Sequence, residues 1–175
     1  MRSRRLRGMR WLLAALVGVF ALAGCSIPSA GAAAVVNGVT IPVASIEAPV
    51  EALGGGETQV AQPNAIVVTQ AVRGVVARQI AAERGLQLTG EPRTRMLAAN
   101  PGLTEFAGDP RVQGLIDDIL DANLVLTAVG EQEFMRVLGE ATVKVNPRYG
   151  AWSQEAGAVA VAGGQLARPW TSTAS

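Results

Sequence analysis

The sequence predicts a mainly α-helical domain with a small β element. Three observations support this fold class. Residues 64–84 carry apolar side chains at helical spacing over more than five turns, and residues 112–126 repeat that spacing. Residues 34–36 and 142–145 are short β-branched segments that lie before and after the helical stretches. With 175 residues the chain has the length of one domain and its leader.

The N-terminus has the pattern of a secretory signal peptide. Residues 1–10 carry five of the fifteen basic residues and no acidic one, and residues 11–24 form an uninterrupted apolar run. A helix that crosses the hydrocarbon core of a bilayer needs roughly twenty apolar residues, so this run is too short for a membrane anchor. We therefore expect residues 1–24 to be removed as a signal peptide.

The tetrapeptide Leu22-Ala23-Gly24-Cys25 resembles the lipobox of bacterial lipoproteins. Small residues before the cleavage point fit a narrow peptidase subsite, and the thiol of Cys25 can form a thioether to lipid. Cys25 is the only cysteine, so an intramolecular disulfide is excluded. We expect lipidation at Cys25, a tether over residues 25–32, and a location on the extracytoplasmic face of the cell membrane.

Cleavage would change the charge balance of the chain. Removal of five basic residues leaves ten against fourteen acidic residues, a net charge of −4. Nucleic-acid binding needs a basic face that neutralises phosphates. The mature chain is therefore not expected to bind nucleic acid.

The first predicted elements of the domain are a strand and a short helix. Ala34 to Val36 should form a strand that enters a tight turn at Asn37-Gly38, a dipeptide suited to positive φ angles. Ser45 is expected to cap a helix that runs to about Leu53 and ends at Gly54-Gly55-Gly56. These glycines lack the lysine and hydroxyl residue of a phosphate-binding P-loop, so we interpret them as a connector.

Residues 64–84 should form the longest helix, with Gly85 at its C-terminal stop. One face of this helix is apolar, whereas Arg73 and Arg84 are expected to point away from it. The residues predicted for the apolar face are Val68, Ala71, Val72, Val75, Val76 and Ala82. This face predicts a helix of the core.

Three shorter helices are predicted after it. The first spans residues 89–100, with Pro92 in its first turn and Asn100-Pro101-Gly102 as its terminator. Asp109-Pro110 is expected to open the second, and residues 131–139 form the third. These assignments complete a bundle of amphipathic helices.

The helix after Pro110 separates apolar from acidic residues. Its predicted apolar face consists of Val112, Leu115, Ile116, Ile119 and Leu126. Asp117, Asp118 and Asp121 fall on the other face, which we interpret as solvated. Carboxylates on adjacent turns could hold calcium weakly, but no loop with ligand spacing accompanies them. A cation site is therefore the weaker interpretation.

The chain should close with a strand at 142–145 that Asn146-Pro147 breaks. Tyr149 and Trp152 could stack on a ligand, but we favour a role in covering the end of a small core. Residues 156–175 are expected to form a weakly structured tail, with one weak strand at most in its alanine- and valine-rich part.

Both ends of the predicted domain resemble the N-terminal chaperone domain of SurA- and PrsA-type extracytoplasmic foldases. Val36-Asn37-Gly38 is similar to the first strand of that family, and residues 145–152 are similar to its last. The family-motif residues in this chain are Asn37, Gly38, Asn146, Pro147, Arg148, Tyr149, Gly150 and Trp152. The resemblance covers residues 33–155. It implies that residues 34–36 pair with residues 142–145, so that a short strand pair closes the helical bundle.

Foldases of this family usually carry a parvulin-type prolyl isomerase module with active-site histidines. This chain has no histidine and no room for the module. The resemblance therefore implies a membrane-tethered holdase that binds unfolded or newly exported polypeptides and has no isomerase activity. The oligomeric state does not follow from the sequence.

The sequence also bears on catalysis. Without histidine, the commonest general base near neutral pH and most zinc sites are missing, and acylation of Cys25 would remove thiol chemistry. The carboxylate pairs Glu131 with Glu133 and Asp117 with Asp121 lie in helical contexts without aromatic platforms for sugars. We predict no enzyme, no cofactor and no metal. Two rivals stay open, a lipid-anchored docking subunit for one specific envelope partner and an enzyme that uses carboxylates alone.

Overall fold

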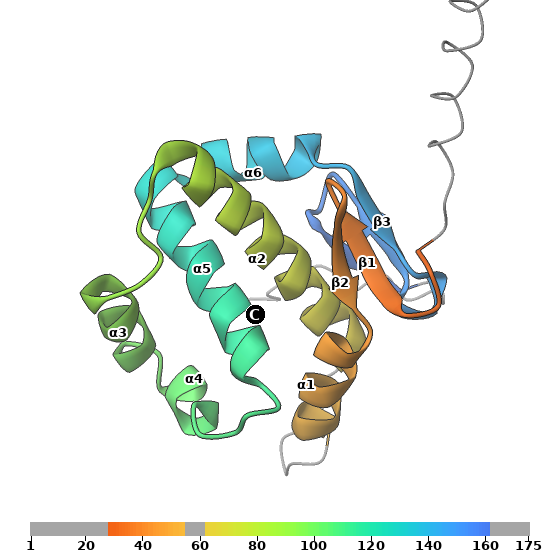
Figure 1. Ribbon diagram of the computed structural model, residues 1–175, viewed down its shortest axis with the longest axis horizontal. Coiled ribbons are helices and arrows are strands. Elements are labelled where there is room, and N and C mark those ends of the chain that lie inside the picture. Colours follow the sequence, from red (N-terminus) through yellow and green to blue (C-terminus); the bar gives the residue numbers. More distant parts are fainter. Residues whose placement is uncertain (1–27, 55–61, 162–175) are drawn as a thin grey trace, which may run out of the picture.

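The computed structural model describes residues 28–54 and 62–161, a mainly helical chain with two small antiparallel sheets (Figure 1). The helices are α1 (Ala44–Gly54), α2 (Pro63–Arg84), α3 (Glu91–Ala98), α4 (Pro101–Phe106), α5 (Gln113–Val129) and α6 (Glu131–Glu140). The strands are β1 (Ala32–Val36), β2 (Val39–Pro42), β3 (Val143–Val145), β4 (Ala151–Ser153) and β5 (Ala158–Ala160), with a 3₁₀ turn η1 (Pro147–Tyr149). The predicted signal peptide, Cys25 and the C-terminal residues 162–175 lie outside the described residues.

The larger sheet has the strand order β2-β1-β3. β1 and β2 form a hairpin whose two-residue turn is Asn37-Gly38, and both turn residues have positive φ, 49° and 84°, as a type I′ turn requires. β1 also pairs antiparallel with β3, in a register that places Ala34 opposite Val145. The two segments for which the sequence predicted strands thus lie side by side, but β2 joins them, so the element is larger than one strand pair.

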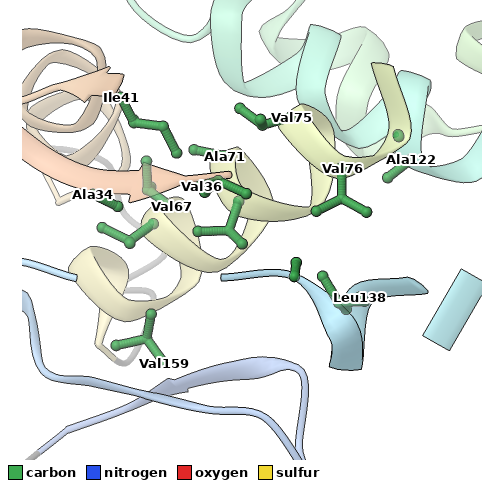
Figure 2. Close-up of a cluster of buried hydrophobic side chains, with 14 of the residues drawn as sticks. Ala34, Val36, Ile41, Val67, Ala71, Val75, Val76, Ala122, Leu138 and Val159 are labelled. Carbon is green, nitrogen blue, oxygen red and sulfur yellow. The ribbon is translucent and has the colours of Figure 1, made fainter. Parts of the chain in front are cut away.

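The two faces of this sheet differ in chemistry. Ala34, Val36 and Ile41 are buried on the face that packs against α2 (Figure 2). Val35 lies between Ala34 and Val36 in β1, so its side chain points to the opposite face of the sheet. There the register aligns it with Thr40 of β2 and Lys144 of β3. A row of threonine, valine and lysine thus crosses the outer face.

Helix α2 is the centre of the core. It packs most extensively on α5 and also contacts β1, α6 and β5 (Figure 2). The predicted helix is confirmed, and Gly85 ends it with φ 65°. By length and composition α2 could cross a membrane, but 61% of its apolar window is buried inside the domain, as in a core helix.

The buried surface of α2 is wider than the single apolar face that the sequence predicted. Ala82 is exposed, whereas its neighbour Ala81 is buried. Arg73, expected to point away, is partly buried with its guanidinium over the ring of Phe134 in α6, 5.7 Å from the ring centroid. The reason is that several elements surround α2, so side chains on most of its circumference meet protein and not water.

Three predicted boundaries also differ. Pro101 does not only end a helix but begins α4, because its fixed φ suits a first turn. Asp109 does not cap α5, which begins at Gln113; its carboxylate instead accepts from the amide of Arg111 at 2.9 Å. Ser45 lies inside the first turn of α1 and donates to the carbonyl of Pro42 at 2.7 Å.

The folded part of the chain extends beyond the predicted domain end at residue 155. β5 lies in the segment expected to be weakly structured, and it pairs with β4 in a register that places Trp152 opposite Val159. The amide of Val159 donates to the hydroxyl of Thr69 in α2 at 3.0 Å. This contact attaches β5 to the core helix.

Candidate functional site

The two asparagines of the family motif bind the strands of the larger sheet together. The side-chain oxygen of Asn37 accepts from the amide of Thr142 at 2.8 Å, and its amide group donates to Gln79 of α2 at 2.8 Å. Asn146 donates from its side chain to the carbonyl of Ala32 at 3.2 Å. Each asparagine satisfies backbone groups at one end of the β1–β3 ladder, which is a structural task.

The aromatic residues of the motif lie at the edge of the core. Tyr149 is buried, and the guanidinium of Arg148 covers its ring at 4.5 Å from the centroid. Arg148 also pairs with Glu47 of α1 at 2.5 Å. Trp152 is partly buried against the core, and within the described part of the chain its buried Nε1 has no hydrogen-bond partner. Gly150 connects η1 to β4. These positions favour packing over ligand stacking.

The acidic residues of α5 form an ion-pair network. It corrects the interpretation of Asp118 and Asp121 as solvated, whereas Asp117, with a side chain 57% exposed, does face solvent. Asp121 has a side chain only 9% exposed, and it receives Arg93 of α3 at 2.6 Å and Arg78 of α2 at 3.0 Å. Arg93 also pairs with Asp117, and Arg78 with Asp118 at 2.7 Å. The prediction failed because α2 and α3 cover a face of α5 that would be free in an isolated helix.

Asp118 of α5 lies against Gly74 of α2. A Cβ atom added to Gly74 would lie 2.2 Å from the carboxylate oxygen of Asp118, so a side chain at position 74 would force Asp118 to move. Burial raises the pKa of Asp118 to about 6, against the opposing hydrogen bond and charge of Arg78. The network therefore contains a carboxylate that titrates near neutral pH.

Helices α3 and α4, residues 91–106, form an arm along α5 (Figure 1). Neither helix has a buried residue. The arm covers a small apolar cluster of Val112, Ile116 and Leu120, which we call the α5 cluster, with the partly buried side chains of Met96, Leu97 and Leu103. Two ion pairs of Arg93 add to this attachment. The α5 cluster is thus closed in this structure by a thin cover.

Four large apolar side chains are exposed among the described residues: Val39, Ile66, Phe106 and Val161. A shallow depression of about 470 Å³ lies on the outer face of the larger sheet. Its lining consists of Pro28, Ser29, Ala32, Val35, Gly38, Thr40, Thr142 and Lys144.

Three of the four carboxylates considered for catalysis, Glu133, Asp117 and Asp121, are engaged with arginines. Glu133 receives Arg136 at 2.8 Å and also Arg84, and the hydrogen bond from Arg136 lowers its pKa to about 2. Asp117 and Asp121 share Arg93. Within residues 28–54 and 62–161, no group of three or more potential metal ligands is gathered. In each of these two pairs, at least one carboxylate is therefore held by an arginine.

Comparisons with protein-family models, with curated proteins and with solved structures each gave no match. The resemblance to extracytoplasmic chaperone domains therefore comes from the sequence motifs and from no matched protein.

Proposed function

We propose that this chain is a membrane-tethered extracytoplasmic lipoprotein whose helical domain binds unfolded or newly exported polypeptides. The signal-like N-terminus and Cys25 support the tether. The pairing of β1 with β3, on either side of the helices in the sequence, supports the chaperone-domain resemblance. In this proposal the β1–β3 pair closes the helical bundle, and the binding surface lies elsewhere.

The observation that carries polypeptide binding is the thin cover over the α5 cluster. Because α3 and α4 contain no buried residue, separating the arm from α5 exposes much less apolar surface than unfolding the domain. The open form presents Val112, Ile116 and Leu120 along one stripe of α5. An apolar segment of a client then replaces Met96, Leu97 and Leu103.

This binding mode suits clients of varied sequence. Burial of apolar surface contributes roughly 25 cal/mol per Å² whatever the side chain, so a short stripe binds weakly and with little selectivity. The ion pairs of Arg93 with Asp117 and Asp121 keep the stripe covered when no client is present. A covered resting state also protects the domain from self-association.

The test uses the full lipid-bearing protein in nanodiscs and measures suppression of aggregation of a thermally unfolding client. We expect suppression by the wild-type protein. Arg93→Ala removes both ion pairs of the arm and should lower the molar ratio needed for half-suppression several-fold. Arg95→Ala is the control, because Arg95 lies on the same helix, is exposed and pairs only with Glu91 at 3.6 Å. Absence of suppression at large molar excess would refute polypeptide binding.

The tether has its own test. Cys25→Ser should release the protein from membranes or stall it uncleaved, because the thioether cannot form. Normal processing and retention of this variant in the membrane fraction would refute lipidation at Cys25.

The alternative is a docking subunit for one specific envelope partner. It is favoured by the small number of large apolar side chains, four among the described residues, that the closed form exposes for promiscuous binding. Photocrosslinking in cells from a probe at Phe106 separates the two functions. Many client masses support the holdase, whereas a single stoichiometric product supports docking.

A further inference from the structure

The outer face of the larger sheet has features that suit a flat anionic surface. Thr40, Val35 and Lys144 form one row across β2, β1 and β3, and no described element packs on this row. The lining of the depression there contains one cation, Lys144, and no acidic residue. Among the described residues, Lys144 has no carboxylate partner within ion-pair distance.

The length of the chain between Cys25 and this face limits where the face can lie. Pro28 and Ser29 line the depression. An extended chain spans at most about 3.6 Å per residue, so the Cα atom of Pro28 lies within about 11 Å of that of Cys25. A lipid on Cys25 therefore keeps this edge of the sheet next to the membrane surface.

The arm lies away from this face. Figure 1 places helices α3 and α4 on the side of α5 that is remote from the larger sheet. Turning the Lys144 face to the lipid brings the cation of the depression's lining to the headgroups and leaves the α3–α4 arm remote from them.

We propose that the outer face of the β2-β1-β3 sheet rests on the membrane, with Lys144 against the phosphates of anionic lipid headgroups, so that the α3–α4 arm points away from the bilayer. This inference rests on the tether of the proposed function. It adds an orientation: the client-binding end faces the extracytoplasmic space, where exported chains emerge.

The experiment uses the full lipid-bearing protein in nanodiscs of phosphatidylcholine and phosphatidylglycerol. Acylation blocks Cys25, so single cysteines can be labelled with an environment-sensitive fluorophore at Thr40→Cys or Thr142→Cys on the sheet face. Ala99→Cys, at the exposed end of α3, is the matched control. Quenching by headgroup-spin-labelled lipid should be several-fold stronger at positions 40 and 142 than at position 99.

Charge variants test the role of Lys144. Lys144→Gln should reduce the quenching at position 40 at least twofold without releasing the protein, whereas Arg95→Gln, which removes one cation from the arm, should not. With Lys144 intact, nanodiscs of phosphatidylcholine alone should reduce the quenching at position 40 as much as Lys144→Gln does. Unchanged quenching in Lys144→Gln overturns the lysine–phosphate contact.

Two further outcomes separate this inference from the proposed function. Equal quenching at positions 40, 142 and 99 in nanodisc-bound protein overturns the orientation and leaves the tether intact. Loss of the wild-type protein from nanodiscs on washing overturns both. Polypeptide binding is measured separately by aggregation suppression, so its failure does not resemble either outcome.

Discussion

The core around α2 and the α3–α4 arm are stabilised by different interactions. In the core, α2 is surrounded by β1, α5, α6 and β5, and side chains such as Phe134 and Val36 are fully buried. The arm contributes no buried residue and is held by three partly buried apolar side chains and the ion pairs of Arg93. The core therefore resists local opening, whereas the arm is the part that can separate from α5 while the rest stays folded.

The largest expected loss of unfolding free energy comes from a substitution in the core. Phe134→Ala removes a fully buried ring of α6, and large-to-small substitutions of this kind cost about 3–5 kcal/mol of unfolding free energy. Phe106→Ala in the arm is the matched control, and because Phe106 is 38% exposed and belongs to neither core cluster its loss should be well below that of Phe134→Ala. Urea denaturation measures both. Similar losses in the two variants would contradict the distinction between core and arm.

A smaller effect is expected where the core and the ion network meet. Gly74→Ala forces α2 and α5 apart at Asp118, because the added Cβ would overlap its carboxylate, and overpacking of this kind costs about 1–3 kcal/mol. Gly139→Ala in α6 is the control. Its Cβ would meet no atom within 4 Å, so it should gain about 0.5–1 kcal/mol through helix propensity. Thermal unfolding should give opposite signs for the two alanines.

Arg93→Ala should act on the arm alone. Loss of the ion pairs with Asp117 and Asp121 should lower the free energy of arm opening by about 1–2 kcal/mol, less than for a fully buried pair because Arg93 is partly exposed. Hydrogen exchange should accelerate in residues 91–106 and stay unchanged in α2. Arg95→Ala should change neither segment. Faster exchange in α2 would show that arm and core open together.

The smallest expected effect is a pH dependence from Asp118. Its pKa is about 6 in the folded chain against 3.8 as the ordinary value, so the folded state binds more protons, and stability is gained as pH falls through 6 and lost as pH rises through it. Between pH 7 and pH 5 the wild-type protein should gain about 1 kcal/mol relative to Asp118→Asn. Denaturation at both pH values measures the difference. A constant difference would contradict the burial of this charge.

Some elements followed from local sequence rules. Asn37-Gly38 formed the expected turn because few dipeptides tolerate positive φ at both positions, and Gly85 ended α2 for a similar reason. The site did not follow in this way. The spacing of Asp117, Asp118 and Asp121 is that of a solvated helix face. The residues near them in the sequence do not predict that Arg78 and Arg93 are their partners. A signal was present in Gly74, a glycine inside a strongly helical stretch, which points to close approach of another element.

The sequence by itself determined the helical class, the turn at Asn37-Gly38, the stop of α2 at Gly85, and the expectation of a processed, lipid-bearing N-terminus, because each depends on residues that are neighbours in the chain. Only the tertiary structure decided which charges are buried, where α3 and α4 lie, and which sheet face stays open. Those features depend on pairs far apart in sequence, such as Arg78 with Asp121 and Arg93 with Asp117. Packing sets their distances, and local propensity carries no information about them.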